Sequence, residues 1–306
     1  MKISWITIPV FLLPACNAGD APDIVNASAE ESSPAAVFSG ELPDYWYRGT
    51  AEITTYYLSQ ARYGELREGE AVLIQVTEPF LAESQVKDEG YADASGASVP
   101  VLKTNLLRRF VTGIYDYSVM TSVFTPTDGT AYPHTLKVTT SSQDWCGQSY
   151  TQLNRGTADW NMQLRSYFER EGDVDRAVAG DFLEDELFNR IRIGGQLPTG
   201  TFRVVPPTSY LLLTHQPYAA ATADLSTESV GDSLALLTLR YADLPRTVTV
   251  TYERASPYLI RGWTETYPSG GDTLTTTASL RGRLQTAYWG QNGTTDRPLR
   301  DDLGLD

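Results

Sequence analysis

The chain has 306 residues, of which 41% are hydrophobic and 20% are charged, a composition typical of folded globular proteins. Asp and Glu number 38 against 24 Lys and Arg, so the net charge is −14. A uniformly acidic surface repels phosphate backbones, which argues against nucleic acid as a partner. The length suits one β domain of up to about 250 residues, or two smaller ones that share a core.

The first 15 residues predict an export signal. Lys2 supplies a positive charge, and the apolar run Ile3–Leu13 is shorter than the roughly 20 residues that span a bilayer. Leu13-Pro14-Ala15 then leads into Cys16. A large aliphatic residue, a small residue and a cysteine at these positions resemble the lipobox of bacterial lipoproteins. The resemblance implies that residues 1–15 are cleaved and that Cys16 carries the acyl chains, palmitate among them, that anchor the protein to a membrane.

Residues 16–40 are rich in Ala, Ser, Pro, Glu and Asp, which predicts a flexible tether behind the lipidated cysteine. Asn17 stands where an aspartate in enteric bacteria would favour the inner membrane. We therefore expect a cell-envelope protein anchored in the outer membrane, facing the periplasm or the cell surface. The alternative is an ordinary secretory signal that happens to contain a cysteine.

Residues 41–306 show a hydrophobic period of two, which predicts half-buried antiparallel strands. Val248, Val250 and Tyr252 alternate with threonines, and Trp160, Met162 and Leu164 alternate with polar residues. Turn residues divide the pattern into roughly twelve strands, with expected turns at Arg67-Glu68-Gly69, Pro126-Thr127-Asp128-Gly129, Asn154-Arg155-Gly156 and Pro268-Ser269-Gly270-Gly271.

One helix is expected at about residues 181–191, because Leu183, Leu187 and Ile191 recur on one helical face. The acidic residues of its first turn suit the helix dipole, although they also suggest a cation site or an acid–base pair. The fold class is therefore mainly β. One architecture is a large antiparallel curved sheet or partial barrel with the helix plugging its open side, and the other is two packed sheets with the helix at a corner.

No residue pattern predicts catalysis, a cofactor or a metal site. His134 and His215 lie near prolines and in no metal or triad motif, so we expect structural roles for both. Cys146 follows Trp145 among strand residues and is expected to be a small buried residue. If Cys16 is acylated, Cys146 has no disulfide partner. The alternative is an envelope hydrolase that uses Cys146 or a histidine.

Eighteen tyrosines give the strongest hint of a binding role. Aromatic rings with a polar tip line ligand cavities and protein interfaces, although they also suit the half-wet faces of a sheet. The aromatic runs are Tyr45-Trp46-Tyr47, Tyr56-Tyr57, Tyr115 with Tyr117, and Tyr288-Trp289. We therefore expect a non-enzymatic protein that binds an apolar ligand such as a lipid, or a protein partner in the envelope.

Five short motifs together resemble an uncharacterised lipoprotein family of Bacteroidota and relatives. They are Asp44-Tyr45-Trp46-Tyr47, Gln60-Ala61-Arg62-Tyr63-Gly64-Glu65-Leu66, Val76-Thr77-Glu78-Pro79-Phe80, Trp145-Cys146-Gly147 and Ala287-Tyr288-Trp289. Some members carry the label septum formation inhibitor Maf. Maf pyrophosphatases are cytoplasmic α/β enzymes with an N-terminal Ser-x-Ser-Pro-Arg-Arg loop, which this chain lacks. The resemblance implies an outer-membrane lipoprotein and brings no catalytic residues.

Overall fold

The computed structural model describes residues 42–91, 96–194 and 197–305. Over these residues, sixteen strands form one sheet. Their bounds are β1 Ala51–Arg62, β2 Glu65–Leu81, β3 Val86–Lys87, β4 Ser98–Thr112, β5 Tyr115–Pro126, β6 Lys137–Asp144, β7 Gly147–Arg155, β8 Trp160–Ser166, β9 Asp173–Val178, β10 Phe182–Leu183, β11 Gly200–Val205, β12 Ala221–Val230, β13 Leu234–Tyr241, β14 Thr247–Glu253, β15 Ile260–Ser269 and β16 Asp272–Thr286. The helices are α1 Leu187–Gly194, α2 Thr208–Thr214 and α3 Leu299–Asp302, with 3-10 turns at Asp44–Tyr47, Glu184–Glu186, Tyr288–Gly290 and Thr294–Asp296.

The strands follow one another as antiparallel hairpins, in the order β10 to β16, then β1, β2 and β4 to β9. The short pair β10–β11 is parallel. β10 and β9 are the end strands of this path, so the sheet is open. The expectation of a mainly β fold is confirmed. A single curved sheet, and not two separate packed sheets, is the architecture.

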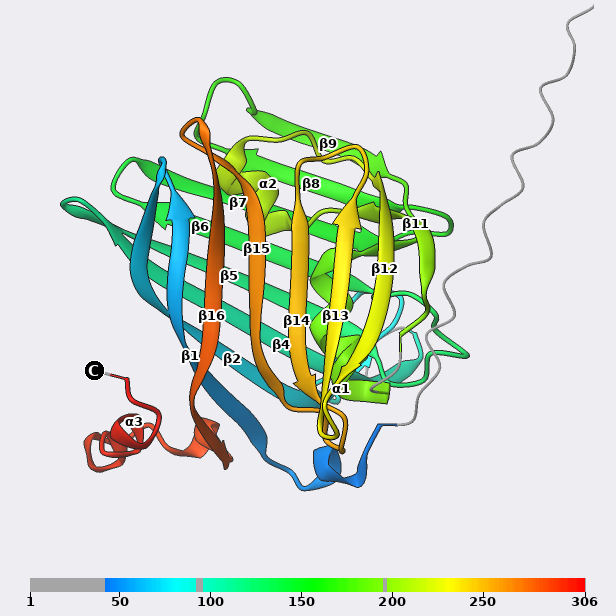
Figure 1. Ribbon diagram of the computed structural model, residues 1–306. Coiled ribbons are helices and arrows are strands. Elements are labelled where there is room, and N and C mark those ends of the chain that lie inside the picture. The colour runs from blue at the N-terminus through cyan, green and yellow to red at the C-terminus, as the bar shows by residue number, and fades with distance from the viewer. Residues whose placement is uncertain (1–41, 92–95, 195–196, 306) are drawn as a thin grey trace, which may run out of the picture. The chain divides into compact units, whose positions relative to one another are not determined.

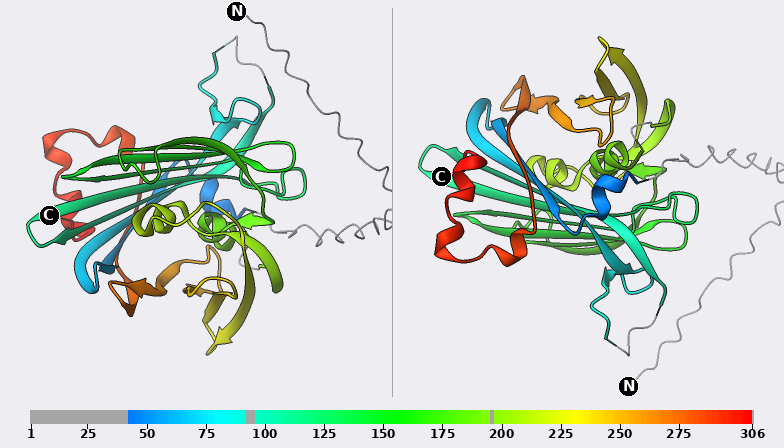
Figure 2. Two further views of the ribbon diagram at one scale, coloured as in Figure 1. Left: turned by 90° about the horizontal axis from the view of Figure 1, so that it is seen from above. Right: turned by 90° about the horizontal axis from the view of Figure 1, so that it is seen from below.

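The sheet bends until its two halves face each other. We call β11–β16 the C-terminal arm and β4–β9 the N-terminal arm, with β1 and β2 in the bend between them. Figure 2 shows α1 and α2 lying in the interior between the arms. Inward side chains from both arms pack against these helices in one large apolar cluster, which includes Tyr56, Phe110, Leu187, Leu237 and Trp263. The helices therefore fill most of the concave side.

The expected helix begins later in the chain than its hydrophobic pattern suggests. Phe182 and Leu183 pair with Val204 and Val205 as a short strand, and a 3-10 turn separates that strand from α1. The predicted face is nevertheless the buried one, because Leu183, Leu187 and the following Ile191 are at most 2% exposed. α2 was not expected. Its three leucines are all buried, so it shows no amphipathic period.

One expected turn is wrong. Arg67-Glu68-Gly69 lies within β2, and the chain reverses at Tyr63 and Gly64, both of which have positive φ angles. Gly69 is needed for a different reason: a Cβ atom there would collide with the carbonyl oxygen of Arg109 on β4. The turn after β5 and the Gly270-Gly271 turn between β15 and β16 are where the sequence places them.

The C-terminal segment packs on the opposite, outward side of the bend. Leu303 and Leu305 are buried against Ile53 and Val72, and the Thr55 hydroxyl donates a 2.6 Å hydrogen bond to the Leu303 carbonyl oxygen. The C-terminal segment therefore covers part of the outward side of β1 and β2, and a pocket of about 270 Å³ remains between it and these strands.

Candidate functional site

A pocket of about 430 Å³ opens between the two arms at one end of the sheet. We call it the mouth pocket. It is enclosed by the β1–β2 turn, the β13–β14 turn, the β15–β16 turn and the last turn of α2. Its volume falls within the range of about 300–1,000 Å³ that is usual for small-molecule sites. It is the most spacious of the pockets found among the described residues.

The walls of the mouth pocket are aromatic and aliphatic. Tyr210 on α2 and Tyr267 on β15 meet edge to face, with their ring centroids 5.3 Å apart. Leu213, Leu244 and Pro245 add aliphatic surface. A few polar groups placed in a largely apolar wall are typical of ligand pockets, because they fix the orientation of the bound molecule.

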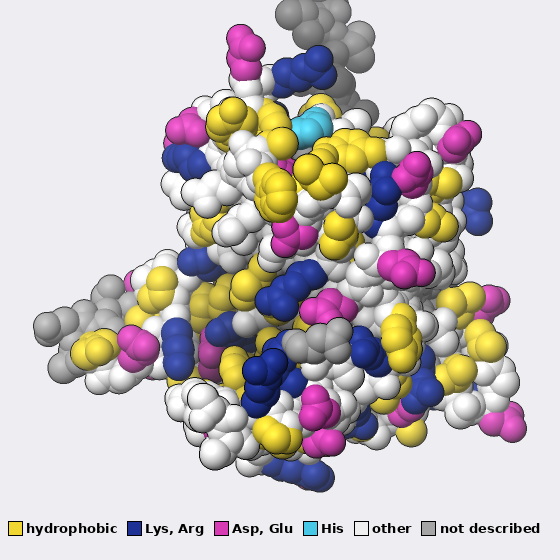
Figure 3. All heavy atoms as spheres, turned by 90° about the vertical axis from the view of Figure 1, so that its left-hand side faces the viewer, with side chains coloured by type: hydrophobic (Ala, Val, Ile, Leu, Met, Phe, Trp, Pro, Cys, Tyr) yellow, Lys and Arg dark blue, Asp and Glu magenta, His cyan; other side chains and the backbone are white. Residues whose placement is uncertain are grey.

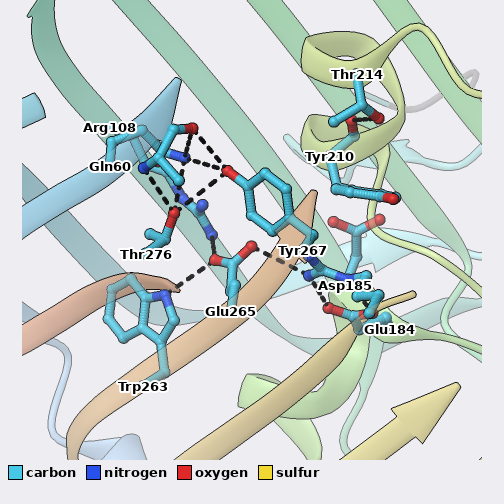
Figure 4. Close-up of polar contacts among 12 residues, drawn as sticks. Gln60, Arg108, Glu184, Asp185, Tyr210, Thr214, Trp263, Glu265, Tyr267 and Thr276 are labelled. Carbon is cyan, nitrogen blue, oxygen red and sulfur yellow. Dashed lines mark hydrogen bonds and ion pairs between the residues drawn. The ribbon is translucent and has the colours of Figure 1, made fainter. Parts of the chain in front are cut away.

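Next to the two tyrosines lies a charge cluster, which we define as Arg108, Glu184, Asp185, Arg246 and Glu265; all but the half-buried Asp185 are buried. Figure 4 shows Glu184, Asp185 and Glu265 near the two rings. Arg246 lies between two carboxylates, 2.5 Å from Glu184 and 3.1 Å from Glu265. Arg108 lies 2.6 Å from the other oxygen of Glu265. The Arg246 guanidinium is also 4.4 Å from the Tyr210 ring centroid. The charge cluster therefore lies behind the tyrosine wall of the mouth pocket, and none of its five members lines the pocket itself.

Two carboxyl groups of this cluster have pKa values shifted in opposite directions. Burial raises the pKa of the Glu265 carboxyl, but Arg108 and Arg246 outweigh that effect and hold it at about 2. Burial raises the pKa of Asp185 to about 7, with a further contribution from the neighbouring Glu184, even though the Thr208 amide donates a hydrogen bond to Asp185. Asp185 therefore carries a proton part of the time near neutral pH.

A second, smaller space of about 50 Å³, the inner cavity, is lined by every member of the charge cluster except Arg246. Its lining is mostly apolar, with Leu106, Val250 and Trp263 among the residues. A water molecule needs roughly 10–15 Å³ of such space, so the inner cavity has room for a few waters. It is too small to be a ligand site of its own.

His215 lines the mouth pocket at the end of α2. Its Nδ1 atom lies 2.5 Å from a carboxylate oxygen of Glu171, and its ring packs edge-on against Phe168. These contacts are compatible with the structural role expected of this histidine. It meets an acidic residue at a pocket, which is the arrangement that the hydrolase alternative requires of a histidine.

Arg62 lines the same pocket from the end of β1. Its guanidinium donates hydrogen bonds to the Leu213 carbonyl oxygen and to the hydroxyls of Tyr63 and Tyr117, the last two at 2.9 and 3.0 Å. The guanidinium carbon also lies 4.1 Å from the Tyr63 ring centroid. All of these partners are neutral, so the positive charge of Arg62 is held in place without being neutralised.

Cys146 is not the buried core residue that the sequence suggested. It lies exposed in the turn between β6 and β7, where Asp144 accepts hydrogen bonds from the backbone amides of Cys146 and Gly147. The turn residues therefore face solvent, and Trp145 beside it is 69% exposed. His134 lies elsewhere, edge-on against the ring of Trp160, and burial and Arg155 lower its pKa.

Exposed apolar side chains surround this end of the sheet. Strand registers place the β1–β2, β4–β5, β6–β7 and β8–β9 turns at the same end as the mouth pocket. Figure 3 shows hydrophobic side chains gathered around a histidine in the upper part of one face. The exposed residues of these turns are Tyr63, Leu66, Val111, Ile114, Trp145 and Tyr167.

The remaining expectations have mixed outcomes. Cys16, the expected lipidation site, lies outside the described residues. Of the aromatic runs, Trp46 and Tyr56 are core residues, whereas Tyr47 and Tyr57 are exposed. In the described part of the chain, no three His, Cys, Asp or Glu residues are placed to hold a metal ion. No helix in that part is long and apolar enough to cross a bilayer.

Sequence reasoning missed the residues that shape the mouth pocket and the charge cluster behind it. Trp263, Glu265 and Tyr267 alternate along β15, which places the glutamate on the same inward face as two aromatic rings. A charged residue at an inward position of a strand is a signal of a buried ion pair, and it was available in the sequence.

Comparison of the chain with models of protein families, with curated proteins and with solved structures finds no match. The residues themselves therefore carry the functional inference.

Proposed function

We propose that this protein is a lipid-anchored envelope protein that binds a small amphipathic molecule in the mouth pocket. The anchor rests on the sequence around Cys16 alone. The binding role rests on one observation: a 430 Å³ pocket between the arms of the sheet, with an aromatic and aliphatic wall and few polar groups. A bound molecule would contact Tyr210 and Tyr267, and the charge cluster would lie behind these rings.

The rigidity of the pocket supports this role. Tyr267 donates a 2.8 Å hydrogen bond to the Ala61 carbonyl oxygen, and Gln60 donates a 2.9 Å hydrogen bond to the Tyr267 hydroxyl. The position of this ring is therefore fixed between β1 and β15. A pocket whose walls are held before binding loses less conformational entropy when a ligand enters, which favours affinity.

A fluorescence titration tests the proposal. An apolar dye such as N-phenyl-1-naphthylamine should bind the wild-type protein and be displaced by single-chain amphiphiles. Leu244→Asp places a charge in the wall and should weaken dye binding at least about tenfold. Leu66→Asp is the matched control, because Leu66 is exposed at the start of β2 and is not among the residues that line the pocket. Equal dye binding by both variants would contradict the proposal.

A hydrolase remains the second candidate, and the His215–Glu171 contact is the observation that favours it. A carboxylate that orients an imidazole is one part of a catalytic triad, and a nucleophile is the part still required. In the described residues, the hydrogen bonds of His215 include none to a Ser, Thr or Cys side chain. Turnover of a short-chain nitrophenyl ester that is lost in His215→Gln would favour this candidate. Equal slow turnover in both proteins would reject it.

A further inference from the structure

We propose that the mouth pocket recognises its ligand by an anionic head group, carboxylate or phosphate in chemistry, which Arg62 binds. This inference rests on the proposed binding function and names the class of ligand. Acidic residues outnumber basic ones by 38 to 24 in this chain. Yet of the described residues that line the mouth pocket, none is Asp or Glu, while one is Arg and one is His. The lining thus has the opposite charge to the protein as a whole.

Arg62 is the source of that charge. Across the described residues it makes no ion pair, in contrast to Arg246 behind the pocket wall, which lies between two glutamates. Its hydrogen bonds to Leu213, Tyr63 and Tyr117 use neutral oxygens only. A guanidinium has five N–H groups, of which these hydrogen bonds use three; the Nε–H is buried without a partner, so one N–H of Nη1 is left for an anion. The charge of Arg62 is therefore available to an anion in the pocket.

The clamp around Arg62 also sets its position. Leu213 holds one end of the guanidinium from α2, and the hydroxyls of Tyr63 and Tyr117, 2.7 Å apart, hold the other. Arginine bound in this way loses little further freedom on meeting a carboxylate or phosphate, and such charge-assisted hydrogen bonds are stronger than neutral ones. A ligand with an anionic head and an apolar tail would place the head at Arg62 and the tail against Leu244 and Pro245.

Two acidic residues lie near Arg62 and His215, and both already have hydrogen-bond partners. Asp144 lines a space of about 20 Å³ together with Arg62 and His215, and it accepts hydrogen bonds from the Cys146 and Gly147 amides. Glu171 contacts His215 directly. One carboxylate oxygen contacts the Nδ1 atom of His215, and the other accepts a hydrogen bond from the Ser166 hydroxyl. The side chain of Glu171 is only 13% exposed. Glu171 is not among the residues that line the mouth pocket, which leaves Arg62 as its permanently charged group.

Calorimetric titration of the full chain with amphiphiles of one tail length tests the inference. Dodecanoate, dodecyl phosphate, dodecyltrimethylammonium and dodecyl maltoside differ only in the head group, and each is used below its micelle concentration. We expect at least one anionic head group to bind about tenfold or more tightly than the cationic and neutral ones. The ratio of dodecanoate to dodecyl phosphate affinity then separates a carboxylate site from a phosphate site.

Arg62→Gln should remove the preference for anions while the neutral amphiphile still binds, and Arg62→Lys should keep part of the preference. Arg254→Gln is the matched control, because Arg254 is exposed and distant from the pocket lining. Equal wild-type affinity for all four head groups would overturn the assignment of an anion and leave the pocket as a binding site. No binding of any amphiphile would overturn the proposed function as well. If an Arg62 variant does not fold, the titrations of the wild-type protein with the four amphiphiles still test the preference for an anionic head group.

Discussion

Asp185 provides the sharpest test of the electrostatics behind the wall of the mouth pocket. Its pKa is raised from 3.8 to about 7 in the folded protein. The folded state therefore binds this proton more tightly than the unfolded state. The contribution of Asp185 to stability is greatest below pH 4, falls as the pH rises towards 7 and is constant at higher pH. Asp185→Asn removes this titration and can still accept the hydrogen bond from the Thr208 amide.

The size of the effect follows from the shift. One pKa unit corresponds to 1.36 kcal/mol, so a shift of about three units sets a ceiling of about 4 kcal/mol. Asp185 faces the inner cavity, where a few waters reduce the cost of the charge, so we expect about 1–2 kcal/mol. The loss begins at pH 3.8, so 1.2 of the roughly three units already lie below pH 5. Asp185→Asn should therefore be more stable than the wild type by about a third of that amount at pH 5 and by the full amount at pH 8.

Urea unfolding of both proteins at pH 5, 6, 7 and 8 measures the difference directly. Glu228→Gln on β12 is the matched control, because its side chain is exposed and its stability difference should not change with pH. A difference between Asp185→Asn and the wild type that stays constant over this range would refute the electrostatic reasoning. So would a variant that is less stable than the wild type at pH 8.

Four further predictions follow from the packing and from the sequence. Arg246→Met leaves Glu184 and Glu265 without their shared partner and should cost about 3–5 kcal/mol in urea unfolding, whereas a cost below about 1 kcal/mol would contradict the buried pairs. Cys146→Ser should change the free energy of unfolding by less than about 0.5 kcal/mol, and the wild-type thiol should react with Ellman's reagent in the folded state; reaction only on unfolding would contradict its exposure. Leu303→Asp should cost about 2–3 kcal/mol by thermal or urea unfolding, with exposed Asp301→Ala as a neutral control, because Leu303 packs on Ile53 and Val72. Cys16→Ser should move the protein from the membrane fraction to the soluble fraction of the cell envelope, and an unchanged distribution would reject the lipid anchor.

The strands could be predicted from the period-two pattern where one face of the sheet is buried and the other is exposed to solvent. Val248, Val250 and Tyr252 alternate with threonines, and all three are at most 4% exposed. The number of strands was underestimated, at about twelve against sixteen over the described residues, because long neighbours such as β1 and β2 reverse in only two residues. Such a short turn hardly interrupts the alternation of hydrophobic and polar residues, so two strands are easily counted as one.

The candidate site was less predictable, because it is assembled from distant segments. Arg62, Tyr210 and Tyr267 meet only through the bend of the sheet, and no local spacing in the sequence records that bend. Cys146 was misplaced for a related reason. A tryptophan beside a cysteine within strand residues is typical of a core position, but Asp144 caps a turn there and directs the tripeptide into solvent.

Native mass spectrometry of the full chain, purified gently from the cell envelope, tests the proposed binding role most directly. We predict that the wild-type protein and Leu66→Asp carry an additional small mass that collisional activation releases, and that Leu244→Asp does not carry it. A clean mass for the wild-type protein in repeated preparations would contradict the account. An additional mass that persists in Leu244→Asp would place the ligand outside the mouth pocket and contradict it equally.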